Sequence, residues 1–338
     1  MSQKRVNILY QCDNNFAFMA GVSLTSLLEN ASEEIKYDIY ILTPDMSEEN
    51  RKKYRSLHEY YANIDFDITF LDATGCEQQF REWNVPAHRG SRVTYYKLLL
   101  QQFFDGTDVD KIMHIGADTL VLGTLEELSD FDFHGKPLAL NWSEKLYQRY
   151  IPRNYKYRVA EMIYFNLIEW KRQNCQQRII DHIQNIGEIY GSKDEGIINM
   201  EFQHDIIQLP LKYNLYGMAT DFSLKNKRKF YNAPIITEKE IIDAYKNPQI
   251  LHIARSFVFR PCEQDNHDPN NELWWQYCEK SPWKGMAPLT DQPKLGWKEK
   301  IFRELYLHLP KSIAQLMYIY FRHIHGYLLN LTHPAKTG

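Results

Sequence analysis

The chain has few cysteines for its length and no paired cysteine motif. Its five cysteines are scattered over 338 residues, and no two of them form a Cys-x-x-Cys pair. This pattern argues against a disulfide framework and against a zinc knuckle. It favours a reducing compartment.

Long apolar runs and a strong excess of charge are also lacking. A membrane-spanning helix needs about 18 apolar residues in succession, and the chain has no such run, so we expect no transmembrane helix. No apolar leader precedes the strand-like segment Val6-Asn-Ile-Leu-Tyr10, which predicts a cytoplasmic protein. The formal net charge of −3 gives no reason to expect a nucleic acid as partner.

What the chain does contain is an alternation of strand-like and helix-like segments. We predict strands over 6–10, 37–42 and 66–71, separated by a helix over 17–30 and a second helix that begins after a Ser47 cap. A β-α-β-α-β start predicts an α/β fold with a mostly parallel sheet flanked by helices.

The later part of the chain continues this alternation. The pattern predicts a Tyr- and Leu-rich helix over 93–104, a short helix from Asp194, and strands over 112–115, 138–140 and 158–165. Two aromatic and basic stretches, 141–160 and 212–235, have no clear period. We expect them to be loops over a site.

One short motif stands out, between Lys111 and Gly123. An apolar strand over 112–115 stops at Gly116-Ala117-Asp118, and a second apolar run follows. In open α/β sheets, ligands bind in a crevice at the carboxyl ends of the strands, and an aspartate that follows a buried strand lies where it can contact them. The alternative is a turn-forming or helix-capping aspartate.

Several separated segments resemble glycosyltransferase family 8, whose members are retaining enzymes with a GT-A fold, a Rossmann-like domain that binds nucleotide sugars. They are Asn7-Ile-Leu-Tyr-Gln-Cys-Asp-Asn-Asn-Phe-Ala17, Arg92-Val-Thr-Tyr-Tyr-Lys-Leu98 and Asn270 to Trp283. The resemblance covers nearly the whole chain and is strongest to the bacterial branch that builds lipopolysaccharide and other surface glycans. It implies a mixed, mostly parallel sheet, a UDP-sugar donor, and a glycan or glycolipid acceptor.

The resemblance also assigns roles to residues. It implies that Asp118 and His252 bind Mn²⁺ or Mg²⁺ and that Asp194 and Glu195 lie beside the reacting sugar carbon. Hard oxygen ligands suit such an ion. The residues expected to hold the donor are Gln11, Asp13, Asn14, Phe16, Lys97, Ala117, Asp118 and Arg260.

Four motifs depart from the family pattern. Gly116 stands where the family has the first aspartate of Asp-x-Asp, and Val159-Ala-Glu161 stands where it has Asn-x-Gly. The family's Asp-Gln-Asp is Asp194-Glu195-Gly196, while Arg260 takes the place of a phosphate-binding lysine. These changes lower the expected affinity for a metal ion.

Each candidate residue also has a structural interpretation. Asp13 can be a turn residue, Asp194 and Glu195 can be helix caps, and Arg260 can be a surface side chain. His114, two residues before Gly116, is expected to be a core histidine. The basic cluster 225–229 is either a solvated face or an attractor for an anionic acceptor or lipid.

The tail beyond about Lys294 is basic and amphipathic. We predict a glycosyltransferase domain over 1–285 and a helical extension over 286–338 that binds the inner surface of the cytoplasmic membrane. The alternative is a C-terminal helix that packs on the main domain.

These observations predict a retaining hexosyltransferase, which would move glucose or galactose from a UDP-sugar to lipopolysaccharide or another surface glycan. The alternative is a degenerate family member without activity that binds glycan or stabilises a partner enzyme. Gly116 is the residue that separates the two hypotheses, because it stands where the family has a metal ligand. An inactive family member would not need a metal-dependent site for UDP.

Overall fold

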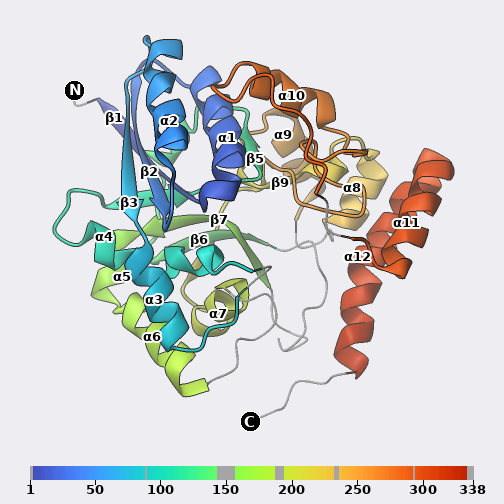
Figure 1. Cartoon of the computed structure of the whole chain (residues 1–338). Helices are drawn as coiled ribbons and strands as arrows, with labels where there is room; N and C mark the ends of the chain where they lie inside the picture. Colours follow the sequence, from blue (N-terminus) through green and yellow to red (C-terminus); the bar gives the residue numbers. More distant parts are fainter. Residues whose placement is uncertain are drawn as a thin grey trace.

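The computed structural model describes residues 3–87, 90–142, 157–186, 194–231, 236–291 and 294–332, with side chains in the last segment up to residue 323. Its centre is a seven-stranded sheet with helices on both faces (Figure 1). In order across the sheet, the strands are β3 (Phe66–Asp72), β2 (Ile35–Thr43), β1 (Lys4–Gln11), β4 (Lys111–His114), β7 (Arg158–Asn166), β6 (Leu138–Trp142) and β8 (Ile206–Gln208). Only β7 runs antiparallel to its neighbours, so the predicted α/β fold with a mostly parallel sheet is confirmed.

Helices bury both faces of the sheet, which explains the near-continuous apolar runs of its central strands. Ile8 and Tyr10 of β1 face α1 (Ala17–Glu29) and α2 (Glu48–Tyr60), and Leu9 faces the opposite layer. That layer contains α3 (Thr74–Glu82), α5 (Leu167–Arg172), α6 (Cys175–Ile186) and α7 (Asp194–Glu201). Ser47 caps α2 as predicted, and its hydroxyl accepts a hydrogen bond from the Asn50 amide at 3.2 Å.

Two features of this layer differ from the sequence-based prediction. The segment 93–104 is mostly a 3-10 helix, η2 (Val93–Leu99), followed by one short α-helix, α4 (Gln101–Phe104). Its apolar and aromatic side chains are buried on several sides, so its composition did not reveal the tighter winding. The helix α3 was not predicted.

A second, three-stranded sheet lies beside the first. It consists of β5 (Thr119–Val121), β10 (Ile250–His252) and β9 (Leu215–Tyr216). The elements around it are η4 (Leu211–Tyr213), η5 (Gly217–Ala219), α8 (Leu224–Phe230), α9 (Glu238–Lys246) and α10 (Asn271–Glu279). The short turns η1 (Asn14–Phe16) and η3 (Glu126–Leu128) complete the described elements before the C-terminal helices.

The expectation of irregular loops over 212–235 is therefore wrong for 212–231. Aromatic side chains such as Tyr213, Tyr216 and Phe230 are buried there, and this burial holds short strands and helices in place. On α8, the Lys227 ammonium donates to the carbonyls of Thr220 and Phe222, so this part of the basic cluster is bonded internally. The remainder, 232–235, and residues 143–156 of the other expected loop lie outside the described residues.

The C-terminal segment forms two helices, α11 (Trp297–His308) and α12 (Lys311–Thr332), at one side of the molecule (Figure 1). Tyr318 of α12 is buried, and its hydroxyl hydrogen-bonds that of Tyr216 at 2.8 Å. On α11, in contrast, Trp297 is 70% exposed and Ile301 is 51% exposed. None of the described helices combines the length and the apolar character that crossing a membrane requires. A domain boundary near residue 285 stays a prediction.

Candidate active site

The predicted metal ligands lie together at the carboxyl ends of β1 and β4. Asp118 follows β4 in the turn that leads into β5, and His252 is the last residue of β10. Antiparallel pairing of β5 with β10 places His252 opposite Thr119, the residue after Asp118. Two segments more than a hundred residues apart in sequence are thereby fixed at one corner of the sheet, the usual position of ligand sites in open α/β folds.

Asp118 uses its two oxygens differently. Its Oδ2 accepts a charged hydrogen bond from the guanidinium of Arg260. Its Oδ1 faces Nε2 of His252 at 3.7 Å, which is too long for a hydrogen bond. Arg260 therefore holds the carboxylate in place and leaves one oxygen directed at the histidine.

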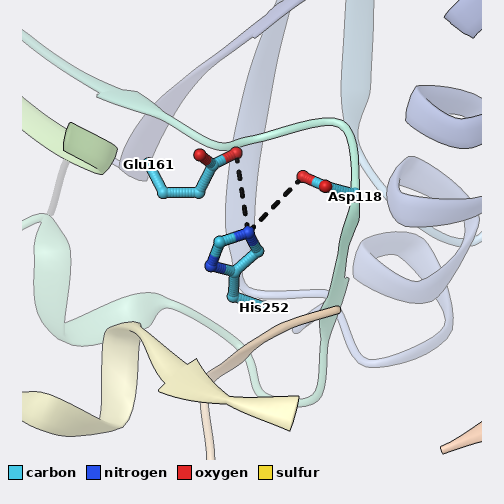
Figure 2. Close-up of side chains that lie close together, drawn as sticks. All are labelled: Asp118, Glu161 and His252. Carbon is cyan, nitrogen blue, oxygen red and sulfur yellow. Dashed lines mark ion pairs between the residues drawn. The ribbon is translucent and has the colours of Figure 1, made fainter. Parts of the chain in front are cut away.

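Glu161 of β7 completes a cluster of three. Figure 2 shows Asp118, Glu161 and His252 pointing toward one another from three different elements. Oε1 of Glu161 lies 3.9 Å from Nε2 of His252, and the three groups offer ligand atoms that all lie within 4.8 Å of one another. Two carboxylates and an imidazole suit Mn²⁺ and Mg²⁺, so this donor set fits a divalent cation.

Burial and neighbouring charges shift the pKa values of the two carboxylates of the cluster in opposite directions. Desolvation and the neighbouring Asp118 carboxylate raise the pKa of Glu161 well above its ordinary value. Burial also acts to raise the pKa of Asp118, but Arg260 and His252 outweigh it and lower that pKa to about 2. Asp118 is thus the permanent anion of the group.

Sequence reasoning did not include Glu161 among the site residues. The antiparallel pairing of β4 with β7, which sets His114 opposite Ile163, would have indicated it. Glu161 lies on β7 two residues before Ile163, and so just beyond the end of β4, on the side of Asp118. A strand order predicted from sequence does not give this register.

A model of the family described as "Glycosyl transferase family 8" matches residues 7–252. That match spans well over half of the chain and includes Asp118, Glu161 and His252. The chain belongs to glycosyltransferase family 8.

Relatives and solved structures agree with this membership. The chain is 25% identical over 312 residues to a lipopolysaccharide 1,2-glucosyltransferase of Escherichia coli, covering 89% of this chain and 86% of the relative. It is 22% identical over 298 residues to a lipopolysaccharide 1,3-galactosyltransferase of Salmonella typhimurium strain LT2, with 85% and 81% covered. The galactosyltransferase LgtC in complex with donor and acceptor sugar analogs superposes with a TM-score of 0.64 at 17% identity, over 87% of this chain and 100% of that one. This likeness shows that the family 8 chain has the GT-A fold.

Several of the donor-side residues that the family pattern predicted lie at or just after the end of β1. Gln11 accepts from the Lys97 amide at 3.1 Å and so ties β1 to η2. Asp13 caps η1 by accepting from the Phe16 amide at 3.0 Å, and the Asn14 side-chain oxygen accepts from the Ser47 amide at 2.9 Å. Ala117 precedes Asp118 in the turn after β4.

Phe16 lies next to Arg260, the residue that holds Asp118. The Phe16 ring is 41% exposed, and the Arg260 guanidinium carbon lies 5.8 Å from its centroid. An exposed aromatic face next to a fixed guanidinium is a suitable surface for a flat base and an attached phosphate.

The predicted catalytic pair lies at the start of α7. Asp194 forms a buried ion pair with Lys97 at 2.8 Å and also accepts from the Thr94 hydroxyl at 2.8 Å. Glu195 accepts from the backbone amide of Ala160 at 3.1 Å, next to Glu161. The structure therefore brings Lys97, Asp194 and Glu195 close to Glu161, with Lys97 buried rather than open to solvent.

His114 is fully buried under the site. Burial, and then the charge of Lys97, lower the pKa of His114 well below its ordinary value, so the imidazole is neutral. This matches the expected core histidine.

Proposed function

We propose that this protein is a retaining hexosyltransferase that moves glucose or galactose from a UDP-sugar to a lipopolysaccharide-type or other surface glycan. The relatives named above act on lipopolysaccharide as glucosyl- and galactosyltransferases, which supports this class of acceptor. The observation that carries the proposal is the convergence of Asp118, His252 and Arg260 at the carboxyl ends of the strands.

The donor would bind along the edge that runs from β1 to Arg260. The uracil ring would lie against the exposed face of Phe16, near the turn formed by Asp13 and Asn14. The Arg260 guanidinium would hold the diphosphate through two parallel hydrogen bonds. Binding of the phosphates would thereby place the sugar toward the start of α7.

A divalent cation, Mn²⁺ or Mg²⁺, would be held by Asp118 and His252, which present one carboxylate oxygen and one ring nitrogen to the same space. When bound, such an ion neutralises charge on the leaving diphosphate. Arg260 keeps Asp118 oriented and adds a second positive charge at the same phosphates.

The acceptor hydroxyl would attack the sugar carbon from the face that UDP leaves. A new carbon–oxygen bond to the acceptor forms, the bond to the UDP oxygen breaks, and a phosphate oxygen of the leaving UDP takes the hydroxyl proton. Glu195 at the start of α7 would place a negative charge beside the carbon as positive charge develops there. Lys97 would act indirectly, by fixing Asp194 and with it the position of this helix start.

The C-terminal helices would bring the site to the inner surface of the cytoplasmic membrane. Trp297, Ile301 and Leu305 recur every four residues on α11 and are exposed, with Lys298 and Lys300 beside them. An exposed apolar row flanked by lysines is typical of helices that lie on anionic lipid.

A donor screen tests the transfer activity. The protein is incubated with UDP-glucose, UDP-galactose and their N-acetyl forms, with and without MnCl₂, and released UDP is measured. We expect metal-dependent UDP release from one hexose donor. Calorimetric titration with UDP separates the alternative, because a degenerate member would show no metal-dependent affinity for UDP, and that result would reject the enzyme hypothesis.

Vesicle sedimentation tests the membrane association. The intact chain should sediment with vesicles that contain anionic lipid, and the double substitution Trp297→Ser/Ile301→Ser should leave it in the supernatant while UDP affinity stays unchanged. If the substituted protein sediments as the intact one does, α11 is not the membrane contact.

A further inference from the structure

The space above Gly116 is already filled by another residue. A Cβ atom built on Gly116 would lie 2.0 Å from Oε1 of Glu161 and 2.9 Å from its Cδ. A side chain at position 116 would require the carboxyl end of the Glu161 side chain to move. Gly116 has no positive φ, so the reason for a glycine here is space and not backbone conformation.

Strand pairing brings the two residues together. β4 and β7 pair antiparallel, with His114 opposite Ile163. Gly116 and Glu161 each lie two residues beyond this pair, past the end of β4. Adjacent strands of a sheet lie about 5 Å apart, so a side chain of β7 can reach over neighbouring backbone that carries no side chain.

We propose that Glu161 supplies, from β7, the carboxylate that an aspartate at position 116 would otherwise present, and that Glu161, Asp118 and His252 together are the protein ligands of the divalent cation. This inference rests on the proposed function, because it assigns a third ligand to the same site. Gly116 then does not mark a lost ligand. Its lack of a side chain leaves the space that the side chain of Glu161, from the neighbouring strand, occupies.

The surroundings of Glu161 support a ligand role over a structural one. Its side chain is 36% exposed, so an ion arriving from solvent can reach it. It faces the carboxylates of Asp118 and Asp194, with Lys97 and His252 as the positive or ionisable groups near it. Carboxylates gathered this closely repel one another, and a bound cation relieves that repulsion.

With the Glu161 side chain in its observed position, the carboxylate of Glu161 fills the space that a side chain at position 116 would take. Exchanging the two residues should therefore preserve the metal site, whereas removing the carboxylate from both positions should not.

Manganese binding without any sugar donor tests this directly. Free Mn²⁺ is measured by electron paramagnetic resonance during titration of the full-length protein. Glu161→Gln keeps the size of the side chain and should weaken Mn²⁺ binding at least about tenfold, the lower end of what even indirect partners of a metal contribute. Glu59→Gln, the same change on the exposed side of α2, is the matched control and should leave Mn²⁺ affinity unchanged.

Two double variants separate charge from packing. Gly116→Asp/Glu161→Gly should bind Mn²⁺ within a few-fold of the original protein, and Gly116→Ala/Glu161→Gly should bind as weakly as Glu161→Gln. These variants differ only by a carboxylate at position 116, and thermal unfolding of each confirms that it is folded.

The proposal is overturned if Glu161→Gln binds Mn²⁺ as tightly as the original protein, or if the original protein binds no Mn²⁺. It is also overturned if the two double variants bind alike. A different result would reject the proposed function alone: Mn²⁺ binding would depend on Glu161, but no UDP-sugar would be consumed. UDP-sugar turnover with Mn²⁺ affinity independent of Glu161 would reject this inference and leave the proposed function standing.

Discussion

Two ion pairs of opposite character border the site. Lys97 and Asp194 form a pair whose side chains are 4% and 9% exposed, with both oxygens of Asp194 engaged, by Lys97 and by Thr94. Arg260 and Asp118 form a pair whose side chains are each 12% exposed, where one oxygen of Asp118 is bound by Arg260 and the other faces His252. The first pair fixes the start of α7, and the second presents an anion to the site.

The different contacts of the two aspartates indicate different roles, positioning for Asp194 and binding for Asp118. A carboxylate whose two oxygens are both engaged by neighbouring side chains orients an element of structure, whereas a carboxylate with one oxygen directed at an imidazole can take a ligand. Asp194 and Asp118 were both predicted as site residues, Asp194 beside the reacting carbon and Asp118 as a metal ligand. Their contacts in the structure distinguish the two roles.

The largest expected effect is on stability, from Asp194→Asn. Asparagine fills the same space but leaves Lys97 buried without its counter-ion, which costs about 3–5 kcal/mol in the free energy of unfolding. Urea unfolding measures this. Adding Lys97→Met to Asp194→Asn should recover much of the loss, because no buried charge then remains. A loss below about 1 kcal/mol in the single variant would show that this pair does not hold the site together.

A smaller loss of stability and a larger loss of binding are expected from Asp118→Asn. The amide oxygen of asparagine still accepts a hydrogen bond from Arg260, and Glu263 leaves a negative charge near the guanidinium, so the free energy of unfolding should fall less than for Asp194→Asn. Mn²⁺ affinity should fall at least about tenfold, because a charged oxygen facing His252 is lost. If this variant is destabilised as strongly as Asp194→Asn, the two pairs do not differ in the way described.

The smallest effect is expected from Arg260→Lys. Lysine keeps the positive charge beside Asp118 but lacks the planar fork that grips a diphosphate through two hydrogen bonds. UDP affinity measured by calorimetry should fall by up to about tenfold, equivalent to one charge-assisted hydrogen bond, with little change in unfolding. Unchanged UDP affinity would place the diphosphate elsewhere.

Much of the fold could be predicted because it is encoded locally. The strand at 6–10, the Ser47 cap and the apolar strand before Asp118 each depend on neighbouring residues, and each lies where it was expected. The prediction was less successful where burial on several sides conceals the period, as in η2, or where aromatic residues form short strands and turns, as over 212–231. In these segments, packing against distant elements decides the local conformation.

The sequence by itself determined that a carboxylate stands at the end of a buried strand, that the order of elements is that of an α/β glycosyltransferase, and that position 116 lacks a side chain. Only the tertiary structure decided that Glu161 lies over Gly116 and beside Asp118 and His252. The physical reason is that the register between two strands arises from their pairing. Residues about 45 positions apart in the chain carry no local signal of which of them will be opposite each other.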